Sequence, residues 1–113
     1  MQQRLDAIKA TLDLNKAEAI ETYDLAGTDY MVDGVVIATA MADKHLLALL
    51  DFVKKDHKET EQFLHVDISD EWIVIDMGDI LVHLMTETAR SKYHLEAFME
   101  QFEKEKKKRE AAR

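Results

Sequence analysis

Two carboxylates, an imidazole and an indole recur at short, regular spacing in one stretch of this chain. Residues 71 to 85 read EWIVIDMGDILVHLM, which places Trp72, Asp76, Asp79 and His83 at steps of four, three and four. Clustered aspartates can hold Mg²⁺ for phosphoryl transfer, and His83 could take part in the same role. The aspartates could equally pair with a Lys or Arg of a partner protein. Both chemistries stay open at this level.

The alternation of apolar residues predicts that these groups lie on a β-hairpin. With Met77-Gly78 as a two-residue loop, Asp76 faces Asp79 at the tip. The same pairing fills the rest of that face with Val74 opposite Leu81 and Trp72 opposite His83. The other face is the expected core, with Ile73, Ile75, Ile80, Val82 and Leu84. Because like charges directly opposed cost stability, this register predicts a cation at the tip, either a metal ion or a partner's basic side chain.

The elements that must position the hairpin alternate between helix and strand. We expect helices over residues 3 to 13, 44 to about 58 and from Thr86 or Thr88 onwards, and further strands over 19 to 25, 34 to 40 and 63 to 68. The stretch GVVIATA, residues 34 to 40, lacks polar alternation until Thr39, which is typical of a strand buried on both faces. The carboxylate of Asp43 is expected to cap the second helix. This order predicts a single α/β domain with a mixed sheet of about five strands flanked by helices.

Length and composition set the class of protein. With 113 residues, 47% hydrophobic and 34% charged, the chain is expected to form one soluble globular domain. No cysteine is present, so disulfides, thiolate metal sites and a cysteine nucleophile are excluded. No apolar run approaches the roughly 18 residues of a membrane span, and no apolar signal core follows the N-terminus. We therefore expect a cytoplasmic protein that does not engage membranes.

The net charge of −8 is unevenly distributed. Residues 103 to 113 carry six basic and three acidic residues, which leaves −11 on residues 1 to 102. An acidic body repels free nucleic acid and attracts a basic protein surface. The domain is expected over residues 1 to 102, followed by a charged helical tail over 103 to 113. This tail is interpreted as a solvated helix end, with local contact to RNA phosphates as the alternative.

Each candidate residue also has a simpler explanation. Asp-x-Gly-Asp occurs often because Asp and Gly suit turns. Trp72 is interpreted as a partly exposed anchor, since tryptophan is enriched at interface hot spots. His83 is interpreted as a hydrogen-bonded sheet histidine rather than a ligand. Arg90 and Tyr93, one turn apart on the last helix, are interpreted as a surface pair.

The order and spacing of these residues resemble the ribosomal silencing factor family, also called RsfS or Iojap-like. The resemblance spans residues 19 to 98 and rests on DGVVIATA, DKH, DEWIVIDMGDILVHLM and RSKYHLEAF. Its most specific element is Trp-x-x-x-Asp-x-Gly-Asp-x-x-x-His, carried by Trp72, Asp76, Gly78, Asp79 and His83, with Arg90, Tyr93 and Leu95 downstream.

The resemblance implies a non-enzymatic translation regulator without a cofactor. Proteins of this family bind ribosomal protein L-fourteen on the large ribosomal subunit and prevent subunit joining when nutrients are short. The implied partner-binding residues are Trp72, Asp76, Asp79, Leu81, His83, Arg90 and Tyr93. We expect Trp72 and Leu81 to pack on the partner while the two aspartates pair with its basic side chains.

Three alternatives remain at this stage. The family's fold is similar to that of nucleotidyltransferases, so a magnesium-dependent enzyme is one, although none of Gly27, Gly34 and Gly78 precedes the serine of a phosphate-binding turn. A factor for large-subunit assembly, as in organellar relatives, is the second. The third is a homodimer formed through the hairpin face or through Leu95, Phe98, Met99 and Phe102. If the protein binds the ribosome, the basic tail is the segment that could contact ribosomal RNA locally.

Overall fold

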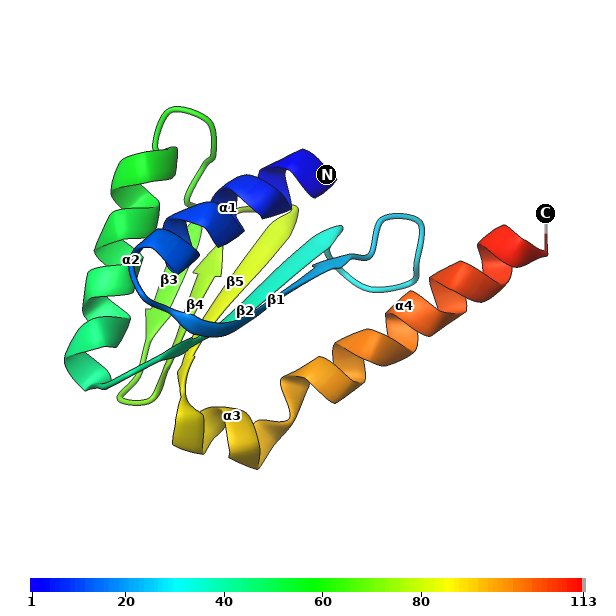
Figure 1. Ribbon diagram of the computed structural model, residues 1–113. Coiled ribbons are helices and arrows are strands. Elements are labelled where there is room, and N and C mark those ends of the chain that lie inside the picture. The colour runs from blue at the N-terminus through cyan, green and yellow to red at the C-terminus, as the bar shows by residue number, and fades with distance from the viewer. Residues whose placement is uncertain (113) are drawn as a thin grey trace.

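The computed structural model describes residues 1–112 and contains one five-stranded mixed sheet with helices on both faces. The elements, in chain order, are α1 (Gln2–Leu14), β1 (Glu18–Asp24), β2 (Gly34–Ala40), α2 (Asp43–His57), β3 (His65–Ile68), β4 (Trp72–Asp76), β5 (Ile80–Thr86), α3 (Glu87–Tyr93) and α4 (Leu95–Ala111) (Figure 1). The strand order is β1-β2-β5-β4-β3, in which only β2 and β5 run parallel. The predicted α/β domain is confirmed.

Each face of the sheet has its own hydrophobic core. Helices α1 and α2 cover one face, while α3, α4 and the β1–β2 loop cover the other (Figure 1). All seven residues of β2 are buried, as expected for a central strand covered on both sides. The face that the sequence assigned to the core packs against α1 and α2, with Leu5, Ile8, Leu46, Leu49, Ile73, Ile75, Val82 and Leu84 among its fully or almost fully buried members.

The hairpin exists, but its predicted register is wrong by two residues. Asp76 is paired with Leu81, and the two central turn residues are Gly78 and Asp79. Met77 closes this turn by donating its N–H to the Ile80 carbonyl at 2.9 Å. Gly78 has φ +91°, which suits the first central position of a tight hairpin turn and is costly for other residues. Because successive side chains of a strand alternate between the two faces, a shift of two residues leaves every strand side chain on its predicted face.

Two predicted helix ends also need correction. Helix α2 begins at Asp43 itself, with Ala42 as its cap residue and no side-chain cap, so Asp43 does not cap it. Thr86 does cap α3, accepting the Ala89 N–H at 3.2 Å. The single long last helix is interrupted at His94, whose φ of +47° ends α3 and starts α4 in a new direction. No glycine or proline marks that break in the sequence.

Helix α4 continues without interruption past residue 102, where the sequence places the end of the domain. Its later turns contact the β1–β2 loop. Lys106 Nζ lies 3.3 Å from Asp24 Oδ1, and Arg109 Nη2 lies 3.3 Å from Asp29 Oδ2. These basic side chains of the tail therefore face acidic groups of the same chain.

Candidate functional site

An aromatic group on the α3/α4 face of the sheet unites three of the predicted site residues. Trp72 lies on β4, His83 on β5 and Tyr93 at the end of α3. Trp72 Nε1 donates to His83 Nδ1 at 3.1 Å, and the Trp72 and Tyr93 ring centroids are 4.9 Å apart. His83 is 7% exposed, Trp72 is half-buried and Tyr93 is 52% exposed. The Trp72 indole thus lies between a buried acceptor, His83 Nδ1, and the exposed ring of Tyr93.

His83 is a hydrogen-bonded sheet histidine, as interpreted from the sequence. Its Nδ1 accepts from Trp72, so Nε2 carries the proton in the neutral ring. This Nε2 is buried and has no partner within residues 1–112. Burial lowers the pKa of His83 to about 4. The neutral form is therefore the native form at physiological pH.

Acidification should destabilise the fold through His83. The unfolded chain takes up this proton near pH 6.5, whereas the folded chain does so only near pH 4. The unfolded state binds more protons between those values, so the free energy of unfolding falls as pH drops through that window, by roughly 3 kcal/mol in all. Urea denaturation at half-unit pH steps checks this. A His83→Phe variant should show a flatter pH profile, and equal slopes for both proteins would contradict the assignment.

Asp76 and Asp79 do not face each other. Asp76 Oδ1 accepts the Gly78 N–H at 2.8 Å, a bond internal to the turn. Asp79 meets a cation, but it is Arg4 of the same chain, whose Nη1 lies 2.6 Å from Asp79 Oδ2. Arg4 also pairs with Glu61 at 2.5 Å. The predicted pair of opposed carboxylates is wrong, and the expected cation at the tip comes from α1.

This ion pair has an electrostatic consequence for the turn. The Arg4 hydrogen bonds hold the pKa of the Asp79 carboxyl below its usual range. Sequence analysis missed Arg4 because it lies 75 residues from Asp79 and no local pattern connects them. Because the guanidinium bonds to both oxygens of the Asp79 carboxylate, the negative charge at the tip is already paired within the chain.

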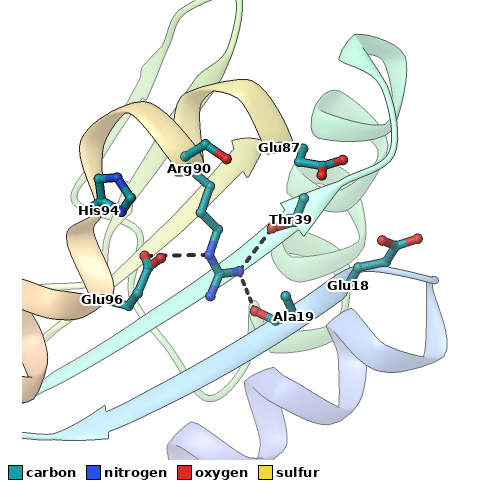
Figure 2. A pocket seen from close by; sticks show the side chains of 8 residues that line it. Glu18, Ala19, Thr39, Glu87, Arg90, His94 and Glu96 are labelled. Atoms are coloured by element: carbon teal, nitrogen blue, oxygen red, sulfur yellow. Dashed lines mark hydrogen bonds and ion pairs between the residues drawn. The ribbon is translucent and has the colours of Figure 1, made fainter.

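Arg90 is buried, contrary to the predicted surface pair with Tyr93. Its Nη1 donates to the Ala19 carbonyl and, at 3.0 Å, to Thr39 Oγ1. Its Nε lies 3.6 Å from Glu96 Oε2. Figure 2 shows the guanidinium extending from α3 towards β1 and β2, whereas the Tyr93 side chain is exposed. Arg90 thus joins four elements from inside the molecule.

A hollow of about 290 Å³ lies beside Arg90, at the carboxyl ends of the parallel strands β2 and β5. Ligands of open α/β sheets often bind in this position. The lining includes three carboxylates, Glu18, Glu87 and Glu96, around the one guanidinium, which is already bonded (Figure 2). Within the described chain no three His, Asp or Glu side chains are placed to hold a metal ion.

Leu81 is also buried, so the prediction that it packs on a partner needs correction. It belongs to the core under α3 and α4, together with Val35, Met85 and Met99. The part of the predicted site that reaches the surface is therefore smaller than the sequence suggested. It consists of Trp72, Tyr93 and the two half-buried aspartates, Asp76 and Asp79, of which Asp79 is paired with Arg4.

A second hollow, of about 250 Å³, adjoins Trp72 on this surface. It is lined by Asp67, Ile68, Ser69, Trp72 and Val74. Residues 67 to 69 of this edge were not among the candidates from the sequence. The signal available in the sequence was Ile68, an apolar residue in the short stretch HVDI next to the hairpin.

None of the helices in residues 1–112 is long and apolar enough to cross a membrane.

Comparison with known families and proteins gives a consistent match. A family model described as "Ribosomal silencing factor during starvation" matches residues 1–113. A curated protein of Haemophilus influenzae named "Ribosomal silencing factor RsfS" is 31% identical over 96 residues, which cover 81% of this chain and 93% of that protein. One of the same name from Bacillus subtilis is 31% identical over 90 residues, covering 77% and 76% respectively.

Solved structures agree with the sequence matches. A crystal structure of a Chromobacterium violaceum protein superimposes with a TM-score of 0.79 at 25% identity, covering 87% of this chain and 84% of that one. A second, from Bacillus halodurans, gives a TM-score of 0.74 at 25% identity and covers 87% and 94%. The fold is thus shared with these two proteins over 87% of this chain.

Proposed function

The chain belongs to the ribosomal silencing factor (RsfS) family, and we propose that it binds the large ribosomal subunit through ribosomal protein L-fourteen. On that surface it sterically blocks joining of the small subunit and represses translation under nutrient limitation. It does so by occupying a surface and not by catalysing a reaction. Family membership supports the link to translation regulation, and the specific partner and steric mechanism are our proposal.

The observation that carries this proposal is the Trp72–Tyr93 pair on an acidic body. Tyr93 is exposed and packs at a tilt of 43° against the half-buried Trp72, whose N–H is already bonded to His83. A ring fixed before binding loses little conformational entropy when a partner covers it. The charge of −11 on residues 1 to 102 favours a basic partner, as many ribosomal proteins are.

The structure changes the role that we propose for each candidate residue. Trp72, Tyr93 and Asp76 contact the partner. Leu81 and His83 position those residues from below, whereas Arg90 joins α3 to β1 and β2; all three are buried. Asp79 holds the hairpin tip to α1 through Arg4. This assignment also disfavours the magnesium-dependent alternative, because each of the two aspartates is already engaged by groups of the chain.

Co-sedimentation with separated ribosomal subunits tests the proposal. The purified protein should pellet stoichiometrically with the large subunit and not with the small one, at low and at moderate salt. Binding should weaken as salt rises, because opposite charges steer the encounter. Purified large subunits loaded with the protein should then fail to form whole ribosomes. Equal binding to both subunits, or to neither, would contradict the proposal.

Self-association is the second candidate, and the structure narrows its surface. Of the four residues proposed for self-contact on the last helix, Met99 is fully buried against the sheet, whereas Phe98 is exposed. Phe98 packs edge-on against Phe102 and Tyr30 of the same chain. Light scattering of the free protein distinguishes a dimer from a monomer, and Phe98→Ser shows whether α4 forms the contact.

A further inference from the structure

Strand β3 leaves one edge of the sheet open. It is the last strand in the order and pairs only with β4. Ser69 donates its N–H to the Trp72 carbonyl at 3.0 Å, which makes that pair a hydrogen-bonded one. Hydrogen-bonded and non-bonded pairs alternate along an antiparallel ladder. The backbone N–H and C=O groups of Val66 and Ile68 therefore point away from β4, towards solvent.

Hollows lie on both sides of this edge. One, of about 250 Å³, is the hollow beside Trp72 and Val74. The other, of about 210 Å³, lies towards α2 and is lined by Asp43, Leu46, Leu47, Ile68, Ser69, Asp70 and Ile73. Asp67 is paired with Val74 and Ile68 with Ile73, so the two hollows occupy opposite faces of the sheet. Alternate side chains of an added strand would enter one hollow and then the other.

The edge itself is apolar, with an acidic rim. Leu64 is 60% and Ile68 is 57% exposed. Asp43, Asp67 and Asp70 line the hollows, whose linings contain no Lys or Arg. Of the features that protect edge strands in soluble proteins, β3 (HVDI) has a short length and the charged Asp67, but no lysine, proline or bulge between residues 65 and 68.

We propose that β3 is a docking edge, to which a strand of the basic partner protein adds by backbone pairing. This inference rests on the proposed function and deepens it by giving the partner's mode of binding. The charge of the rim selects the occupant. A second copy of this chain, paired through the same edge, would bring the Asp67 and Asp70 carboxylates of both copies together, and opposed like charges are destabilising. A strand bearing Lys or Arg would instead neutralise the rim.

The test uses the full chain and isolated large subunits. Ile68→Pro removes one outward N–H but none of the bonds to β4, because proline is tolerated in an edge strand where its nitrogen faces solvent. It should weaken binding by up to about tenfold, the effect of losing one backbone hydrogen bond. Ile68→Val keeps both the N–H and the branched side chain and should bind within about fourfold of the parent, since it removes a single methylene.

A charge reversal provides an independent second arm. Asp67→Lys should weaken binding at low salt more than Asp13→Lys, which makes the same change on the exposed end of α1. Unfolding curves for all four variants verify that each is folded. Should Ile68→Pro fail to fold, the two aspartate variants and the protection of residues 64 to 70 from hydrogen exchange on subunit binding decide the question.

The outcomes separate this inference from the proposed function. If Ile68→Pro binds as the wild type does and both aspartate variants affect binding equally, the docking edge is overturned. The proposed function then still stands. A wild-type protein that does not bind the large subunit overturns both. A wild-type dimer that Ile68→Pro converts to a monomer overturns the choice of occupant in favour of a second copy.

Discussion

Replacing Trp72 by alanine should weaken binding to large ribosomal subunits by roughly 30- to 1,000-fold, the range for an interface hot spot. The indole is the largest half-exposed group at the site and lies between the exposed Tyr93 ring and the hollow next to β3. Its loss removes the anchor and also releases Tyr93 from its stacked position. The dissociation constant from co-sedimentation at fixed salt measures the effect.

Matched variants separate lost contact from lost structure. Phe52→Ala removes an exposed aromatic ring from α2, on the opposite face of the sheet, and should bind like the parent. Trp72→Phe keeps a ring but cannot donate to His83, and should fall between parent and alanine variant. If Trp72→Ala keeps its native circular dichroism and still binds with parental affinity, the aromatic pair is not the anchor.

The faces of the hairpin could be predicted from the sequence, but its register could not. A period of two decides which side chains share a face, and that survives any even shift. Register depends on the turn, and the turn depends on where a positive φ is needed. Centring the loop on Met77-Gly78 put Gly78 second, whereas the structure puts it first, followed by Asp79. The preference of one hairpin turn type for glycine at the first central position was the available signal.

Long-range partners account for the other differences. Arg4 and Asp79 are 75 residues apart in sequence, and Arg90 is 71 residues from Ala19 and 51 from Thr39. Periodicity describes one element at a time, so it cannot show that a charged side chain from one helix ends inside another layer. The break at His94 has the same origin. Packing of α4 across β1 and the β1–β2 loop requires a change of direction that no residue type signals there.

Arg90 supports a weak point of β1, and this explains why a buried charge is placed there. Ala19 has φ +47°, a left-handed backbone that is unfavourable for alanine, and the β1–β2 register shifts between Glu18 and Glu21. The Ala19 carbonyl accepts from Arg90 at this irregular point. One guanidinium thereby bonds to β1, β2 and α4 from its position on α3.

Replacing Arg90 by methionine should lower the free energy of unfolding by about 3 to 6 kcal/mol, because it removes two hydrogen bonds from a charged donor, each contributing about 1.5 to 3 kcal/mol. Methionine fills similar volume but leaves the Ala19 carbonyl and Thr39 Oγ1 without their donor, and Glu96 without its ion-pair partner. Urea denaturation followed by Trp72 fluorescence measures the change. Binding to the large subunit should fall only as far as the folded fraction does, because Arg90 is buried beneath the surface.

Arg109 offers the matched control within the same chain. Its guanidinium pairs with Asp29 and Glu105 on the surface of α4. An exposed ion pair contributes between about 0 and 1 kcal/mol, so Arg109→Met should leave the unfolding curve almost unchanged. Arg90→Lys keeps the charge but not the planar fork that reaches two acceptors at once, and should lose a substantial part of the stability. Equal, small effects at positions 90 and 109 would mean that the layers around β1 hold together without Arg90.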